Sequence, residues 1–150
     1  MELVTERLKI VACTMEVLSC FPNYKLGPHI SSYLEQLEDD TTLLGWGVWL
    51  VMKQENNTII GDIGFKGKPN EQQTIEVGYG IVPSEQGNGY ATEAVAAIIE
   101  WACSSKKVRT ITAQCQRENI PSNKVLMKLG FQHIKSENDM LKWALGVQQL

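Results

Sequence analysis

The hydrophobic and polar positions of this 150-residue chain follow two periods, one typical of strands and one typical of helices. Alternating or β-branched runs predict strands over residues 5–11, 46–53, 58–66, 74–82, 108–114, 132–136 and 140–144. Apolar residues at helical spacing predict helices over residues 15–21, 30–37, 91–105 and 121–129. We therefore expect a single α+β domain over residues 1–150, built on a mixed, mostly antiparallel sheet with two hairpins.

Composition removes several classes of protein. The net charge is −3 and no basic face is clustered, so we expect no nucleic-acid partner. No apolar run reaches the roughly 20 residues of a membrane span, and the N-terminus lacks the apolar core of a signal peptide. These features predict a cytoplasmic protein without a membrane partner.

The four cysteines form no CxxC pair, and the two histidines are scattered. We expect reduced thiols that mostly pack in the core, and no metal site.

A glycine-rich turn lies between the strand predicted at 74–82 and the helix predicted at 91–105. It reads Gln86-Gly87-Asn88-Gly89-Tyr90-Ala91. Free N–H groups and the positive end of a helix dipole make such a turn an anion site, and phosphate is the usual guest. No P-loop lysine follows it, and Thr92 stands where a dinucleotide fingerprint has its third glycine. The alternative is a tight connection in which the glycines serve geometry alone.

The wider pattern is more specific. Gln86-x-x-Gly89-x-Ala91 resembles the [R/Q]-x-x-G-x-[G/A] acyl-coenzyme A signature of the GNAT N-acetyltransferase superfamily. The segment Asn119-x-x-Ser122-x-x-Val125-x-x-Lys128-x-Gly130-Phe131 resembles the second cofactor segment of that family. The opening Thr5-Glu6-Arg7-Leu8 resembles the ribosomal-protein N-acetyltransferase-like branch. The resemblance implies a GNAT fold with roughly six to seven strands, about four helices and a V-shaped splay between two central strands.

The resemblance also implies where acetyl-CoA binds. Main-chain groups of the strand end would meet the pantetheine arm, the glycine turn would hold the pyrophosphate, and the second segment would reach the pantetheine, adenine or 3′-phosphate. Glycines inside the strand, Gly78 and Gly80, fit a close approach by this ligand or a simple bulge. For Asn119 and Ser122 the alternative role is helix capping. The implied cofactor-binding residues are Ile81, Val82, Gln86, Gly87, Asn88, Gly89, Tyr90, Ala91, Asn119, Ser122, Asn123 and Lys124.

The chemistry implied is acyl transfer to an amine, which must lose a proton before it attacks the thioester. Strand alternation puts Glu76 on the same face as the two strand glycines, and we take it as the candidate base. A carboxylate paired to a neighbouring strand is the alternative. Leu126 stands where several branches carry an acidic tyrosine, so Ser122, a water or no acid at all completes the reaction. Tyr79 and Tyr90 stay open as donors.

The acceptor is the least determined part of the prediction. Tyr24, Trp46 and Trp49 either line an amine pocket or pack in the core, and a regular strand would put the two tryptophans on opposite faces. The acceptor is a protein N-terminal amine, a lysine, a polyamine or another small-molecule amine. The alternative functions are a non-catalytic acyl-CoA sensor or scaffold and a generic nucleotide binder. We expect a monomer or a homodimer.

Overall fold

One eight-stranded sheet organises the protein, whose computed structural model describes residues 1–147. The strands are β1 (Glu2–Val4), β2 (Leu8–Ala12), β3 (Val48–Lys53), β4 (Ile59–Phe65), β5 (Thr74–Ile81), β6 (Thr110–Gln116), β7 (Gln132–Glu137) and β8 (Met140–Gly146). Their order in the sheet is β1-β2-β3-β4-β5-β6-β8-β7, and every neighbouring pair is antiparallel except β5 and β6. The predicted α+β, mostly antiparallel architecture is confirmed.

The sheet has one strand more than predicted because the chain turns where we expected a single strand over residues 5–11. The amide of Thr5 donates to the carbonyl of Leu8 at 2.9 Å, and the amide of Leu8 donates to the hydroxyl of Thr5 at 3.1 Å. This tight turn ends β1 and begins β2, so that the two short strands pair with each other. Side chain–backbone bonds of this kind compete with an extended conformation.

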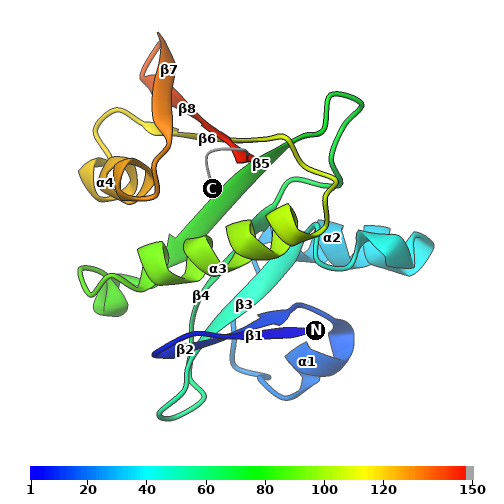
Figure 1. The fold of residues 1–150 in the computed structure, drawn as a ribbon. Helices are drawn as coiled ribbons and strands as arrows, with labels where there is room; N and C mark the ends of the chain where they lie inside the picture. Colours follow the sequence, from blue (N-terminus) through cyan, green and yellow to red (C-terminus); the bar gives the residue numbers. More distant parts are fainter. Residues whose placement is uncertain (148–150) are drawn as a thin grey trace.

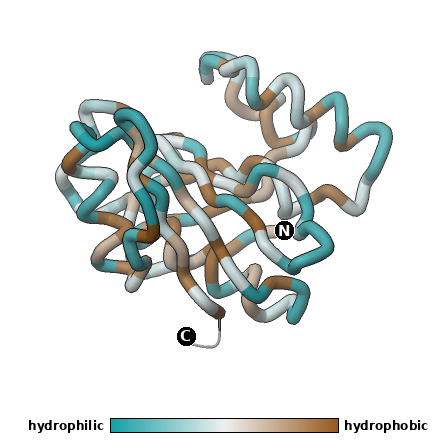
Figure 2. The backbone as a smooth tube through the Cα atoms, turned by 90° about the horizontal axis from the view of Figure 1, so that it is seen from above, coloured by the Kyte–Doolittle hydropathy of each residue, from teal (hydrophilic) through white to brown (hydrophobic). Residues whose placement is uncertain are grey.

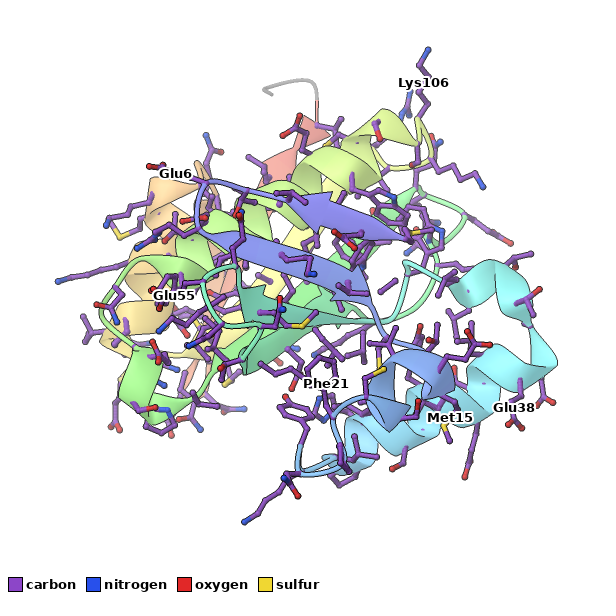
Figure 3. The ribbon with its side chains drawn as sticks, turned by 90° about the horizontal axis from the view of Figure 1, so that it is seen from below. Glu6, Met15, Phe21, Glu38, Glu55 and Lys106 are labelled. Atoms are coloured by element: carbon purple, nitrogen blue, oxygen red, sulfur yellow. The ribbon has the colours of Figure 1, made fainter. Side chains whose placement is uncertain are left out.

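Helices cover both faces of the sheet. They are α1 (Met15–Ser19), α2 (Pro28–Asp39), α3 (Tyr90–Ser104) and α4 (Ile120–Lys128), with 3₁₀ turns η1 (Thr41–Leu43) and η2 (Pro83–Glu85). Figure 1 shows α3 crossing the middle of the sheet, with α4 beside the β6–β8 end. Figure 3 shows α1 and α2 lying together on the side of the sheet opposite α3. None of these described helices combines the length and apolarity that crossing a membrane requires.

The core fills the layer between α3 and the sheet, where Ala94, Val95, Ile98 and Ala102 are fully buried. Seen from above in Figure 2, apolar positions run through the strands and helices while the outer loops are mostly hydrophilic. Burial of this apolar stripe is the main force that holds α3 on the sheet.

The tryptophans predicted to face opposite sides both pack in this core. Trp46 and Trp49 are 6% and 0% exposed, and their rings lie 4.7 Å and 5.3 Å from the ring of Trp101 on α3. The alternation rule does not apply because β3 begins only at Val48, after Trp46. Of the three aromatic residues proposed for the amine pocket, only Tyr24 lines a cleft.

The centre of the sheet is splayed. β5 and β6 pair only from Thr74 to Glu76 and from Thr110 to Thr112. Beyond this point β5 continues along β4, and β6 continues along β8. The two parallel strands therefore separate, and the V-shaped splay implied by the family resemblance is confirmed.

Candidate active site

The loop before α3 has the geometry of an anion site. Gly87 and Gly89 have φ angles of +83° and +80°, a left-handed conformation that side chains disfavour. Gly89 is also the N-cap of α3 and carries no side chain to cap it. The first N–H groups of α3, at Tyr90, Ala91 and Thr92, thus point out of the helix without an intrahelical acceptor. A bound phosphate would complete their hydrogen bonds.

The polar side chains of this loop hold its shape. The amide of Gln86 donates to the carbonyl of Ile81 at 2.8 Å, and the amide of Asn88 donates to the carbonyl of Glu85 at 3.2 Å. Both side chains therefore bind the loop's own backbone. The positive field at the site comes from main-chain N–H groups and the helix dipole.

Arg7 is a residue of this site that we did not predict. Its guanidinium donates to the carbonyl of Asn88 at 2.9 Å, pairs with Glu93 at 2.7 Å and lies 4.3 Å from the ring centroid of Tyr90. A Cβ added at Gly89 would lie 3.5 Å from Arg7 Nη2. Arg7 brings a cation to the glycine turn before α3 from the turn between β1 and β2. Its place in the Thr5–Leu8 motif was the only signal available in the sequence.

The backbone of β5 offers hydrogen bonds to the splay at Tyr79 and Ile81. The Val82 amide donates to the Ile60 carbonyl at 2.8 Å, and the Val82 carbonyl accepts from the amide of Glu85 at 2.9 Å. Because backbone groups alternate in direction along an antiparallel strand, Tyr79 and Ile81 direct theirs away from β4 and into the splay. The predicted contact of Ile81 fits this geometry through its amide, because its carbonyl already accepts from the side chain of Gln86 at 2.8 Å. Both backbone groups of Val82 already bond within the protein, so its contact with the pantetheine stays a prediction, whereas Tyr79 directs its groups into the splay.

The N-terminus of α4 faces the splay from the other side. The side chain of Asn119 accepts from the amide of Ser122 at 3.3 Å, so Asn119 is a helix cap. The hydroxyl of Tyr79 donates to the carbonyl of Ser122 at 3.0 Å and joins β5 to the first turn of α4. Lys124 is exposed on the same helix. Leu126, at the position of the missing tyrosine, is completely buried in the core.

The side chain of Asn123, which we predicted to reach the adenine or the 3′-phosphate, bonds within the protein. Its side chain is 8% exposed. Its amide donates to the carbonyls of Gln116, Arg117 and Asn119 at 3.1–3.3 Å, and its Oδ1 accepts from the thiol of Cys115 at 2.9 Å. Asn123 therefore fastens the turn between β6 and α4.

Glu76 lies at the apex of the V, where the paired part of β5 ends. Its Oε2 accepts from Lys66 at 2.6 Å and from the amide of Gln114 at 3.2 Å, while Oε1 has no partner among the described residues. The carboxylate is 27% exposed. The structure thus confirms the neighbouring-strand pairing that we weighed as the alternative, and still leaves one oxygen free.

A cleft of about 800 Å³ opens between α2 and the face of the sheet that carries the strand glycines. Its floor includes Gly78 and Gly80, and an added Cβ at Gly80 would meet nothing within 4 Å. Asp62 of β4 lines it, holding the hydroxyl of Tyr24 at 2.8 Å and the Nε2 of His29 at 2.9 Å. Asp62 is a residue that we did not predict, since a single acid within an apolar strand carries no motif.

The residues that the structure describes contain no group of three His, Cys, Asp or Glu placed to hold a metal ion. The chemistry available is that of main-chain donors at a splayed sheet, a helix N-terminus and an adjoining cleft. Comparison with known proteins then places the chain. Residues 10–132 match the family model described as "Acetyltransferase (GNAT) domain". The chain belongs to the GNAT acetyltransferase family.

Relatives of this GNAT chain bear acetyltransferase names. It is 37% identical over 111 residues to "Uncharacterized N-acetyltransferase YjdG" of Bacillus subtilis (strain 168), covering 74% of this chain and 66% of the relative. It is 30% identical over 84 residues to "Ribosomal-protein-serine acetyltransferase" of Escherichia coli (strain K12), covering 56% of this chain and 46% of the relative. The chain thus spans about two thirds or less of the length of these two relatives.

Solved GNAT structures share the whole fold. A ribosomal-protein-S5-alanine acetyltransferase from Vibrio fischeri superposes with a TM-score of 0.79 at 18% identity, covering 97% of this chain and 96% of that one. A ribosomal L7/L12 alpha-N-protein acetyltransferase in complex with coenzyme A gives a TM-score of 0.77 at 16% identity, each chain covered to 96%. At these identities the likeness concerns the fold alone.

Proposed function

We propose that the protein is an acetyl-CoA-dependent N-acetyltransferase that moves an acetyl group to a primary amine by direct attack on the thioester. The observation that carries the proposal is that two sets of backbone hydrogen-bonding groups, at the start of α3 and at the end of β5, meet at the splay. The free N–H groups at the start of α3 suit a pyrophosphate, and the backbone groups of Tyr79, with the amide of Ile81, suit the amides of a pantetheine arm in the splay.

The cofactor would be held mainly by main-chain groups. The turn from Gln86 to Ala91 binds the pyrophosphate through backbone donors, and Arg7 adds the nearest positive charge. Asn119 and Ser122 position the start of α4 beside the pantetheine, and Lys124 is free to meet the 3′-phosphate. An N–H of Tyr79 or Ile81 donates to the thioester oxygen and stabilises the negative charge that develops there.

The proton of the attacking amine leaves through Glu76. Its Oε1 is free, and Lys66, which binds Oε2, lines the acceptor cleft, so a water at the cleft's edge links the amine to the carboxylate. Lys66 also fixes the carboxylate in position. Glu76 is therefore proposed as a base that acts at the apex of the V.

Coenzyme A leaves as a thiolate. Burial raises the pKa of Tyr79 to about 12, despite the hydrogen bond to Ser122. Transfer of its proton to a thiolate with a thiol pKa near about 8.5 is unfavourable by about 10³-fold. The single proton of the Tyr79 hydroxyl already goes to the Ser122 carbonyl, so the Ser122 hydroxyl is the group suited to donate a hydrogen bond to the sulfur, and the final proton comes from water.

The alternative is an acyl-CoA-binding sensor or scaffold, and turnover separates the two. Release of free coenzyme A from acetyl-CoA is measured against a panel of N-terminal peptides, lysine derivatives, polyamines and simple amines. Turnover on any of them supports the transferase. Tight binding of coenzyme A without turnover on any amine favours the sensor. A rise in melting temperature with ATP but none with coenzyme A would contradict both. The cytoplasmic location and the monomeric or homodimeric state stay predictions.

A further inference from the structure

The floor of the cleft beside α2 carries glycines, without side chains, between the carboxylate of Asp62 and the splay. Asp62 on β4 is the cross-strand partner of Gly80 on β5, and Gly64 is the partner of Gly78. These glycines present no side chains between Asp62 and the outer edge of β5. Adjacent strands lie about 4.8 Å apart, so Asp62 is one strand away from the line where the splay opens.

Asp62 is fixed in place by two donors from the α1–α2 region. The Tyr24 hydroxyl donates to Oδ2 at 2.8 Å, and His29 Nε2 lies 2.9 Å from Oδ1. Burial, with the neighbouring carboxylate, raises the pKa of Tyr24, which keeps it a neutral donor. An ionised carboxylate has about four acceptor sites, so two remain for a ligand. With 24% of its side chain exposed, Asp62 is partly desolvated and still reachable.

The charges that line the cleft favour a cation at this position. Among the described lining residues, Asp62 is the only carboxylate. The lining also includes Lys66, but this cation is paired with Glu76 at 2.6 Å. A positively charged group entering the cleft therefore meets one carboxylate at the end of the glycine floor, bonded to Tyr24 and His29 and with acceptor sites left over.

This charge is unsuited to the reacting nitrogen itself. The amine must be neutral when it attacks, whereas a nearby carboxylate favours the charged ammonium form. A second cationic group, a few methylenes away from the reacting nitrogen, can stay charged on Asp62 throughout the reaction. Resting on the proposed function, we propose that Asp62, held by Tyr24 and His29, anchors a second positive charge of the acceptor, so that the substrate class is diamine-like amines.

Three acceptors with a matched four-carbon chain test this specificity. They are 1,4-diaminobutane, butylamine and 4-aminobutanoate, which place a cation, a methyl group and an anion at the far end. For the wild-type protein we expect kcat/KM to fall in that order. A charge-assisted hydrogen bond is worth about 10-fold to 100-fold, and this gain is expected for the diamine over butylamine, mostly in KM.

Asp62→Asn should remove this preference and bring the three values of kcat/KM within a few-fold of one another. Because the ratios compare substrates on one protein, they do not depend on the fraction that folds. Asp139→Asn, an exposed aspartate in the β7–β8 turn, is the matched control and should keep the preference. Equal use of the three acceptors by the wild type would overturn the proposal, as would an equal loss of kcat on all three in Asp62→Asn.

Direct binding separates this proposal from the proposed function. If no amine is acetylated, the transferase proposal fails, and calorimetric titration of 1,4-diaminobutane into the coenzyme A-loaded protein still tests Asp62. Weaker binding to Asp62→Asn by tenfold or more supports the anchor. Equal affinity of the two proteins for the diamine overturns it.

Discussion

The guanidinium of Arg7 pairs with the carboxylate of Glu93 at 2.7 Å, across 86 residues of sequence. The backbone amide of Arg7 donates to the same carboxylate at 2.9 Å, and the Thr5 hydroxyl donates to it as well. These bonds attach the turn after β1 to the first turn of α3. The phosphate loop is thus supported by a segment from the start of the chain.

Replacing Arg7 by Met should weaken coenzyme A binding about tenfold, because it removes the cation nearest the loop and its bond to the carbonyl of Asn88. Titration calorimetry measures the Kd. Lys106→Met removes the same charge beyond the other end of α3, where Figure 3 shows the Lys106 side chain extending outward, and should leave the Kd unchanged. An unaltered affinity in Arg7→Met would show that the backbone donors suffice.

The Glu93 carboxylate should make stability depend on pH. Burial alone would raise its pKa, but hydrogen bonds from Thr5 and Arg7 outweigh burial and lower the pKa below the usual 4.5. A lowered folded-state pKa gives stability that is complete above pH 4.5 and is lost as pH falls through the folded value. At pH 7 the wild type should have a higher melting temperature than Glu93→Gln, and the difference between the two melting temperatures should shrink toward pH 3. A difference independent of pH would contradict this contribution.

Gly89→Ala should abolish coenzyme A binding. A side chain at a φ of +80° costs about 1–2 kcal/mol and stands where the phosphates approach. Gly130→Ala is the control, because Gly130 has a similar φ of +90° at the end of α4, outside the phosphate loop. Both variants should melt at lower temperature, while only Gly89→Ala should lose coenzyme A in calorimetry. If Gly89→Ala kept its affinity for coenzyme A, the proposal that this turn binds the pyrophosphate would be contradicted.

Glu76→Gln should lower kcat about 10²-fold while leaving the Kd of coenzyme A unchanged, because a general base contributes at least that much. Steady-state assays of thiol release provide kcat, and calorimetry provides the Kd of coenzyme A. Glu71→Gln, in the exposed loop before β5, is a matched control. If Glu76→Gln turns over as fast as the wild type, the Glu76 carboxylate is not the base and serves only the contacts with Lys66 and Gln114.

Asn123→Ala should destabilise the protein by about 1–2 kcal/mol, since it removes the side-chain bonds to the carbonyls of Gln116, Arg117 and Asn119. Chemical denaturation measures this loss. The folded fraction should bind coenzyme A as tightly as the wild type. Lys124→Ala, one residue along on the surface, should show the opposite pattern, with unchanged stability and weaker binding of coenzyme A. Weaker binding of coenzyme A by folded Asn123→Ala would instead support the predicted contact of Asn123 with the cofactor.

Much of the fold was predictable because local patterns decide it. The apolar stripe of α3, the proline and Asn119 at the start of α4 and the strand periods each act over a few residues. The extra strand was missed because a side-chain bond between Thr5 and Leu8 overrides the extended pattern. Trp46 was misplaced because strand β3 begins two residues later, where pairing with β4 starts.

The site divides along the same line. The sequence by itself determined the glycine turn before α3, since left-handed glycines before an amphipathic helix are a local property of the backbone. Only the tertiary structure decided which backbone groups of β5 face the splay, namely those of Tyr79 and Ile81 and not those of Val82. Only the sheet register and the docking of α2 brought Asp62, Tyr24 and His29 together, and packing of the first turn on α3 brought Arg7 to Glu93. These contacts join segments that lie far apart in the chain, and their residues carry no local pattern that would reveal them.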